Sequence, residues 1–174
     1  TYRVKMTEKD KNCLPPARNE PKPDLPFRTY GEFQVEVFDT GEDRDDDAWY
    51  GIFINGQGGD NYYLFRVRPN ANGCTTGGNW ELRRRRNGSE TVLANASCVS
   101  ALKRGYGSGA KNTLKIVHKS DRTLTLFING VQVFGPFTEN ASQHLTGTAT
   151  GIYVRSDNQI IRIKFDNFLV NKFQ

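Results

Sequence analysis

One heptapeptide constrains the fold of this chain more than any other feature: residues 62–68 read Tyr-Tyr-Leu-Phe-Arg-Val-Arg. Successive side chains of a β-strand point to opposite faces, so these side chains divide into two sets. The first set is aromatic or aliphatic and comprises Tyr63, Phe65 and Val67. The second set carries the charge and comprises Tyr62, Leu64, Arg66 and Arg68. The pattern predicts a strand with one face against a core and the other facing outward, where a functional site is to be sought.

The same period of two recurs along the chain. Further strands are predicted at residues 2–6, 32–38, 50–55, 80–85, 91–93, 113–119, 123–128, 131–134, 151–155 and 160–170. Asn87-Gly88 is a dipeptide that favours a two-residue hairpin turn between such strands. No stretch has a convincing helical period, although we allow one helical turn around Leu102 and another around Leu145. The sequence therefore predicts an all-β fold of two packed antiparallel sheets.

The totals fit one soluble globular domain spanning residues 1–174. The chain is 36% apolar and 25% charged, and its 17 glycines and 11% aromatic residues favour a turn-rich β protein. No apolar run approaches the roughly 20 residues that a membrane span needs. Residues 15–26 are rich in proline and are predicted to be an extended surface crossing. Because the chain opens at Thr1 without Met, we expect it to be part of a longer protein.

The three cysteines are too few for a disulfide scaffold, and no CxxC pair suggests a zinc site. Cys74 and Cys98 flank the Asn87-Gly88 hairpin, so folding of the hairpin brings them to the same end. We therefore predict a disulfide between them, the alternative being two reduced thiols. Cys13 is left over in this scheme.

Several phrases of the sequence resemble the concanavalin A-like lectin/glucanase superfamily, in its laminin G-like branch and its bacterial branches of unknown function. These phrases are residues 49–53, 61–65, 112–116, 124–130, 151–154 and 165–168. The resemblance implies a jelly roll of two curved antiparallel sheets. Many members of the superfamily bind carbohydrate on the concave face or its rim, others hydrolyse glycans, and others are adhesion or sensor modules. The resemblance also marks Asp166 as a candidate calcium ligand.

The charged set of the central strands is the candidate binding site. Alternation predicts that the core side of these strands carries Phe33, Ile52, Phe65, Leu82 and Ile152. The opposite face then carries the candidate ligand-binding residues, which are Glu36, Tyr62, Arg66, Arg68, Glu81, Arg83, Arg85, Tyr153 and Arg155. Gln34 and Asn55 are expected on the same face. Arginine gives planar bidentate hydrogen bonds and tyrosine rings stack on sugar faces, so these types suit a glycan. Cross-strand pairing of Glu36 and Glu81 with arginines on an ordinary solvated face is the alternative.

Glycoside hydrolysis needs two carboxyl groups about 5–9.5 Å apart. The laminarinase-like members of the superfamily place theirs as Glu-x-Asp-x-x-Glu, with an even first spacing. Here Glu36 and Asp39 are three apart, which puts them on opposite faces of a strand. The departure argues against an enzyme, and a cross-strand pair of Glu36 and Glu81 is the remaining catalytic candidate.

Other chemistry has weaker support. The acidic run at residues 42–47 is either a solvated loop or a calcium-binding loop. A structural calcium ion is therefore the only cofactor that we consider. The four arginines at residues 83–86 divide between two strand faces, which argues against nucleic acid, and the net charge of +5 fits solubility or an anionic partner. His118 and His144 lie far apart in the sequence, and we expect no catalytic role for them.

The function predicted from the sequence is therefore a non-catalytic, extracytoplasmic module that binds a glycan on the concave sheet face, where the arginines suit an acidic one. The alternatives are a protein-interaction or sensor module of a larger cell-surface protein and, second, a glycoside hydrolase.

Overall fold

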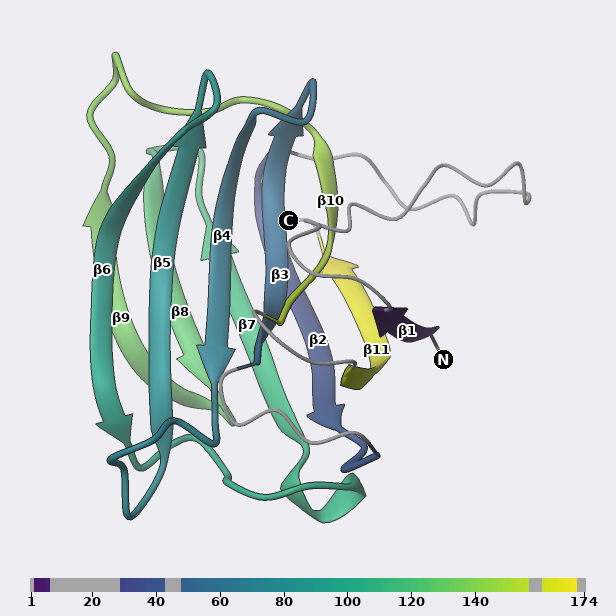
Figure 1. Cartoon of the computed structure of the whole chain (residues 1–174). Coiled ribbons are helices and arrows are strands. Elements are labelled where there is room, and N and C mark those ends of the chain that lie inside the picture. Colours follow the sequence, from purple (N-terminus) through teal and green to yellow (C-terminus); the bar gives the residue numbers. More distant parts are fainter. Residues whose placement is uncertain (1, 7–28, 43–47, 157–160, 172–174) are drawn as a thin grey trace.

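The computed structural model describes residues 2–6, 29–42, 48–156 and 161–171, with backbone alone for 2–6. Within these ranges the chain forms eleven strands and one short 3₁₀ helix, η1 (Ser108–Ala110). The strands build two sheets that face each other, a six-stranded sheet and a five-stranded sheet (Figure 1).

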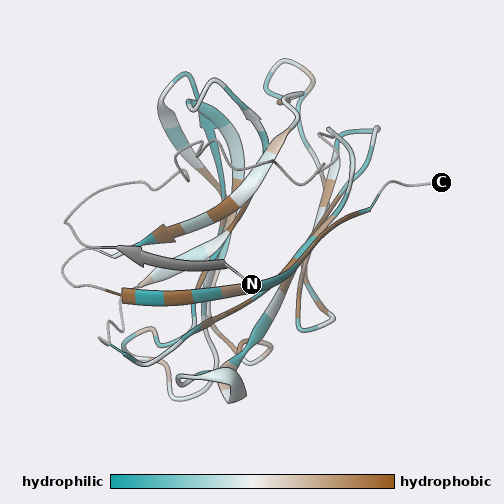
Figure 2. Cartoon of the chain, turned by 90° about the vertical axis from the view of Figure 1, so that its right-hand side faces the viewer, coloured by the Kyte–Doolittle hydropathy of each residue, from teal (hydrophilic) through white to brown (hydrophobic). Residues whose placement is uncertain are grey.

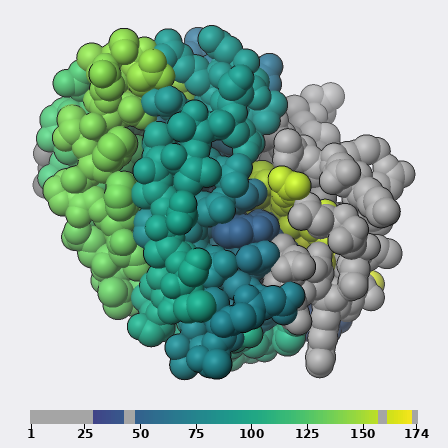
Figure 3. All heavy atoms as spheres, turned by 60° about the vertical axis from the view of Figure 1, so that its left-hand side comes forward, coloured from purple at the N-terminus to yellow at the C-terminus, as the bar shows by residue number. Residues whose placement is uncertain are grey.

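The six-stranded sheet has the order β1-β11-β2-β7-β8-β9. Its strands are β1 (Tyr2–Met6), β11 (Ile161–Asn171), β2 (Gly31–Asp39), β7 (Asn112–His118), β8 (Thr123–Ile128) and β9 (Val131–Thr138). The five-stranded sheet has the order β10-β3-β4-β5-β6. Its strands are β10 (Ala149–Arg155), β3 (Trp49–Gln57), β4 (Asn61–Arg68), β5 (Gly78–Arg86) and β6 (Ser89–Val99). Every strand pair is antiparallel. The last strands of the two sheets, β6 and β9, lie beside each other (Figures 1 and 3).

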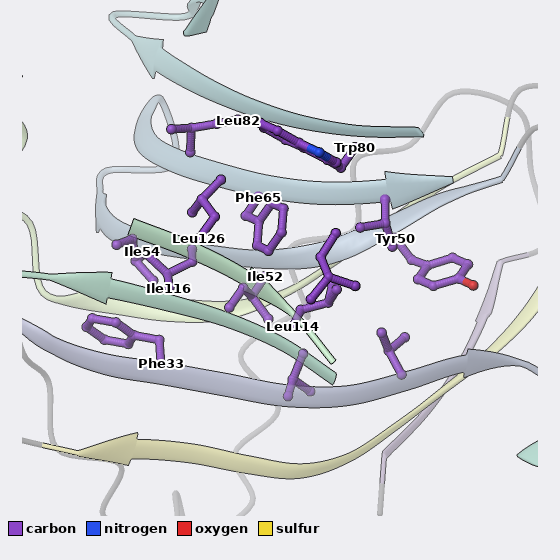
Figure 4. Packing of buried hydrophobic residues seen from close by; sticks show 14 of the residues in the cluster. Phe33, Tyr50, Ile52, Ile54, Phe65, Trp80, Leu82, Leu114, Ile116 and Leu126 are labelled. Atoms are coloured by element: carbon purple, nitrogen blue, oxygen red, sulfur yellow. The ribbon is translucent and has the colours of Figure 1, made fainter. Parts of the chain in front are cut away.

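The core fills the space between the two sheets, as the alternation predicts. The predicted core residues Phe33, Ile52, Phe65 and Leu82 are fully buried there, and Ile152 packs against them partly buried (Figure 4). Figure 2 shows the alternation as brown and teal bands along the strand ribbons. The all-β, two-sheet prediction is confirmed.

Each predicted strand is present, but two are considerably longer than predicted. The strand expected at residues 131–134 is β9, which continues to Thr138. We expected the strand after Asn87-Gly88 to end at Leu93, but β6 continues to Val99. The register of β5 and β6 shifts between Leu82 and Arg83, which leaves Leu93 without an opposite residue. Such a bulge breaks the period of two, so the second half of the strand is lost in the sequence pattern.

Two loops, one hairpin turn and one disulfide can also be compared with the sequence predictions. Neither the loop around Leu102 nor that around Leu145 holds a helix, and η1 lies between them in the chain. Asn87 and Gly88 both have positive φ, as a type I′ hairpin turn requires. The predicted Cys74–Cys98 disulfide is present, with 5.1 Å between the Cα atoms. Cys13 and the crossing at residues 15–26 lie outside the described residues.

Within the described ranges, no helix has the length and apolar character that a bilayer-spanning helix needs.

Candidate functional site

The outer face of the five-stranded sheet, which points away from the core, carries most of the predicted binding residues. Its middle row crosses four strands: Tyr153 of β10 lies opposite Gly51 of β3, Gly51 opposite Arg66 of β4, and Arg66 opposite Glu81 of β5. Side chains opposite each other in neighbouring strands are close enough to interact directly. The row therefore brings together three predicted site residues from distant parts of the chain.

Arg66 is the centre of this row. Its Nε and Nη2 atoms donate hydrogen bonds to Oε2 of Glu81 at 3.0 and 2.8 Å, and its Nη1 donates to the hydroxyl of Tyr153 at 3.2 Å. The guanidinium carbon lies 4.4 Å from the centre of the Trp49 ring, within the range of a cation–π contact. Only 4% of Arg66 is exposed, so its side chain contacts its neighbours in the fold and very little of it faces solvent.

Gly51 makes the contact between Arg66 and Tyr153 possible. A Cβ atom on Gly51 would lie 2.0 Å from the carbonyl oxygen of Phe65 and 2.7 Å from Cα of Arg66. Both neighbours are backbone atoms, so β3 and β4 approach each other too closely for any side chain at this position. The absence of a side chain also leaves a path over β3 from Arg66 to Tyr153.

A second set of contacts continues from Glu81 toward the sheet edge. Arg83 donates from Nε to Oε2 of Glu81 at 2.6 Å and from Nη1 to Oε2 of Glu90 at 2.8 Å. Arg85 lies 3.4 Å from Oε1 of Glu90 and 3.5 Å from Oδ1 of Asp60. We call these alternating groups the arginine–carboxylate ladder; its members are Arg66, Glu81, Arg83, Glu90, Arg85 and Asp60.

The exposed end of the ladder is the part that a ligand can reach. The side chains of Arg83 and Arg85 are 21% and 24% exposed, against 5% for Arg66. Asp60 is the most exposed member, at 62%. The ladder groups that a ligand on this face can contact therefore lie on β5, on β6 and in the turn between β3 and β4, whereas Arg66 of β4 is covered.

The carboxyl group of Glu81 is held ionised. Partial burial raises its pKa, but hydrogen bonds from Arg83 and Arg66 outweigh the burial and leave the pKa below its ordinary value. The group is therefore a hydrogen-bond acceptor at neutral pH.

An apolar layer lies beside the ladder, where the sequence predicts a polar face. Its members are Phe53, Tyr62, Leu64 and Tyr153, with Trp49 packed against them. Tyr62 and Tyr153 are 6% and 7% exposed, so little of either ring is available to stack on a sugar. Burial also raises the pKa of Tyr62. Trp49 is the partly exposed ring of this group.

Arg68 and Arg155, also predicted for the site, lie at one end of this face. The guanidinium carbon of Arg68 is 5.1 Å from the centre of the Trp49 ring, and Arg155 of β10 lies opposite Trp49 of β3. Trp49 thus connects these two arginines to Arg66.

Glu36 is in a different place from the one predicted. It lies on β2 in the six-stranded sheet, with its neighbours Val35 and Val37 in the core. Its Oε2 accepts hydrogen bonds from Lys111 at 2.6 Å and Asn167 at 2.7 Å. The bond from Lys111 is the main cause of the lowered pKa of Glu36.

The predictions that Glu36 shares a face with Arg66 and that it forms a pair with Glu81 are therefore wrong, because the two outer faces are on opposite sides of the sandwich. Gln34 lies on β2 as well and shares this correction. Asn55 is also not on an open face: it is fully buried, and its Nδ2 donates to the carbonyls of Thr29 and Gly147, both at 3.0 Å.

A calcium site remains a prediction. Asp166 lies on β11 opposite Glu36, where Lys111 already supplies a positive charge. The described ranges contain no group of three or more His, Cys, Asp or Glu side chains that could hold a metal ion. Of the acidic run at residues 42–47, only Glu42 is described, and it forms an ion pair with Arg162.

Three residues of the site were missed by the sequence reasoning: Trp49, Asp60 and Glu90. Trp49 precedes the core residue Tyr50, so alternation alone places it on the outer face. The two-residue turn at Asn87-Gly88 pairs Arg85 with Glu90, which fixes the second residue as well. Asp60 lies in a turn, where no period identifies it.

Comparison with known proteins identifies the fold. No family model matches the sequence, and no curated protein matches it either. Among solved structures, the carbohydrate-binding module CBM66 from Bacillus subtilis has a TM-score of 0.55 and 11% identity over 83% of this chain and 76% of its own. A tetrameric galectin from the ball sponge Cinachyrella sp. has a TM-score of 0.56 and 11% identity over 85% and 96%. The fold is concanavalin A-like.

A Bacillus licheniformis β-glucanase has the same concanavalin A-like fold, with a TM-score of 0.53 and 8% identity over 98% of this chain and 78% of its own. These identities are too low to carry more than the fold. The concanavalin A-like sandwich therefore supports either a binding module or an enzyme, and the site itself must decide between them.

Proposed function

We propose that this chain is a non-catalytic carbohydrate-binding module and that the glycan lies on the exposed end of the arginine–carboxylate ladder. The observation that carries the proposal is the alternation of donors and acceptors from Glu81 through Arg83 and Glu90 to Arg85. A sugar hydroxyl both donates and accepts a hydrogen bond, so a pair of neighbouring hydroxyls can bond to a guanidinium and to a carboxylate at once. The concanavalin A-like structures that include a carbohydrate-binding module and a galectin support the same class of ligand.

The ladder favours hydroxyl groups over an acidic sugar. Its three arginines are matched by three carboxylates, Glu81, Glu90 and Asp60, which would repel an anionic ligand. We therefore propose a neutral glycan, in place of the acidic glycan that the arginines alone suggest.

The state of Glu81 favours binding over hydrolysis. A glycosidase needs a carboxylic acid whose pKa is raised so that it can protonate the leaving oxygen. The pKa of Glu81 is lowered by its two arginine partners, and Glu36 belongs to the other sheet.

An extracytoplasmic location fits the proposal. A disulfide such as Cys74–Cys98 persists in oxidising compartments and is rare in the cytosol, where thiols are kept reduced.

Arg83→Gln tests the proposal, with Lys115→Gln as the matched control. Lys115 is similarly exposed, at 28%, but lies on the six-stranded sheet. On a glycan array followed by calorimetry, Arg83→Gln should bind its best neutral glycan about 10- to 100-fold more weakly, because charge-assisted hydrogen bonds contribute about 1.5–3 kcal/mol each. Lys115→Gln should bind as the unaltered chain does.

Four outcomes contradict the proposal. Equal loss in both variants, or none in either, would place the glycan elsewhere. A blank array together with a protein partner whose binding depends on Arg83 would favour the protein-interaction module. Release of reducing sugar from an array hit would make the chain a glycosidase.

A further inference from the structure

A buried pair of histidines lies between the sheets at one end of the sandwich, apart from the ladder. His118 is the last residue of β7, and His144 lies in the connection between β9 and β10. Their Nε2 atoms are 3.1 Å apart, although the residues are 26 positions apart in the chain. His118 is fully buried and His144 partly so. The sequence reasoning treated them as unrelated.

The geometry of the histidine pair fixes where its protons lie. Nδ1 of His118 is 2.9 Å from the carbonyl oxygen of Thr29, which can only accept, so Nδ1 carries the hydrogen. In a neutral imidazole the other nitrogen is then an acceptor. Nε2 of His118 must therefore accept the hydrogen on Nε2 of His144.

This pair belongs to a network that fastens two segments to the end of the sandwich. The carbonyl of Thr29 accepts from both His118 and Asn55, and Asn55 also donates to Gly147. The backbone N–H of Leu145 donates to the hydroxyl of Tyr63 at 3.1 Å. The network joins Thr29 and residues 139–148 to β3, β4 and β7.

Aromatic and charged groups surround the pair on every described element packed against it. The Tyr30 ring stacks on His144 at 6.0 Å and 3°, and the Tyr63 ring packs edge-on to His118 at 5.9 Å. The titratable and charged groups are Tyr30, Tyr63, Arg84, Asp121, Arg122 and Glu139.

Burial and the positive charges outweigh the nearby carboxylates, because Asp121 near His118 and Glu139 near His144 raise the histidine pKa values less than burial lowers them. Burial is the main cause that lowers the pKa of His118 to about 4, while the Thr29 carbonyl acts in the opposite direction, and His144 lowers the pKa further. The pKa of His144 is lowered too, by burial and then by Arg122.

We propose that the histidine pair is an acid-sensitive contact that releases residues 139–148 from the end of the sandwich when both rings are protonated. A first proton on Nδ1 of His144 leaves the Nε2–H···Nε2 bond intact. A second proton has to go to Nε2 of His118, the only nitrogen there without a hydrogen. Two N–H groups and two positive charges then face each other at 3.1 Å, and the contact cannot persist.

The release has a consequence for the outer face. Residues 139–148 lead directly into β10, which carries Tyr153, the hydroxyl partner of Arg66. Loss of the contact would loosen the start of β10 and weaken ligand binding at acidic pH. This consequence rests on the proposed function, whereas the contact itself does not.

The test is a pH titration of the ¹⁵N-labelled full chain by NMR, which needs no ligand. Above pH 6.5, imidazole spectra should show the Nδ1–H form for His118 and a hydrogen on Nε2 of His144. Near pH 4 the amide signals of residues 143–147 should move together with the His118 imidazole, and exchange of the Leu145 amide should accelerate about tenfold beyond its intrinsic rate. The signal of the Ile128 amide on β8 should not shift with His118, and its hydrogen exchange should not accelerate. An Nε2–H form of His118 would overturn the proposal, as would signals of residues 143–147 that stay still.

His144→Phe separates the pair from general acid unfolding. Phenylalanine keeps a ring to stack on Tyr30 but removes the charge and the Nε2 hydrogen, so the shared movement of residues 143–147 with His118 should disappear. A His144→Gln variant tests the same point without a ring. If both variants are folded and still show the wild-type movement, the histidine contact is not its cause. A normal titration with no glycan binding at any pH would refute the proposed function alone.

Discussion

The hydroxyl of Tyr153 lies 3.2 Å from Nη1 of Arg66, although 87 positions separate the two residues in the chain. The bond passes over Gly51 and closes a row of side chains from the edge strand β10 to β5. Both side chains are buried. This bond and the Arg66–Glu81 ion pair hold Glu81 in place, and Glu81 in turn positions the more exposed Arg83.

Replacing Gly51 with alanine should destabilise the fold strongly. The new Cβ would lie 2.0 Å from the carbonyl oxygen of Phe65, and neither strand can move away without breaking its ladder of hydrogen bonds. We expect the free energy of unfolding in urea to fall by roughly 3–5 kcal/mol. Gly109→Ala is the control, because nothing lies within 4 Å of its Cβ position and its backbone is not left-handed. Equal effects of the two substitutions would contradict the close approach of β3 and β4.

Glu81→Gln should cost more stability than Glu90→Gln, although both replace a carboxylate of the ladder. Glu81 is the carboxylate partner of Arg66, which stays buried and charged when that partner is lost. We expect a loss of about 2–3 kcal/mol for Glu81→Gln and at most about 1 kcal/mol for Glu90→Gln, whose partners are more exposed. Urea titrations at neutral pH measure both. A larger loss for Glu90→Gln would show that Arg66 relies on other groups.

Stability should fall as the pH is lowered from 6.5 to about 4. The pKa of His118 is lowered to about 4 in the folded chain and is ordinary, near 6.5, in the unfolded chain. Between these values the unfolded state binds more protons, so protons favour unfolding, and the loss is complete below about pH 4. The shift corresponds to at most about 3 kcal/mol.

His118→Gln checks that pH dependence, because glutamine does not titrate. The variant should be less stable than the unaltered chain near pH 7, and its unfolding free energy should change less between pH 6.5 and about pH 4. Chemical denaturation across the pH range supplies both curves. If the unfolding free energies of the variant and the unaltered chain changed equally with pH, other groups would be responsible for the pH dependence.

Reduction of the Cys74–Cys98 disulfide should lower the thermal midpoint. The bridge joins residues 24 positions apart, and a loop of that size contributes about 3 kcal/mol in the chain-entropy model. For a chain of this length the loss corresponds to roughly 10 °C. Calorimetry with and without dithiothreitol measures it. In the Cys74→Ser/Cys98→Ser double variant the reductant should have no further effect, and any further shift would come from another thiol.

The sequence was sufficient for the faces of the strands but not for their assignment to sheets. Alternation places Phe33 and Phe65 correctly in the core, and it places Glu36 and Arg66 correctly away from it. It cannot tell that β2 and β4 belong to different sheets, because the period of two is the same in both. That ambiguity produced the mistaken pair of Glu36 with Glu81.

Loops were beyond the reach of the same reasoning. His118 and His144 meet because the connection between β9 and β10 packs across the end of the sandwich, and no spacing in the sequence encodes that path. Asn55 shows the same limit: its positive φ ends the alternation of β3 and turns its amide toward Thr29 and Gly147.

Arg83 donates to Glu81 within β5 and to Glu90 on β6, the edge strand of its sheet. A molecule that recruits this guanidinium must compete with the bond that helps to hold the edge in place. Ligand binding at Arg83 and opening of β6 are therefore coupled. Hydrogen exchange of the backbone amides along β6 would then report on binding without any label on the ligand.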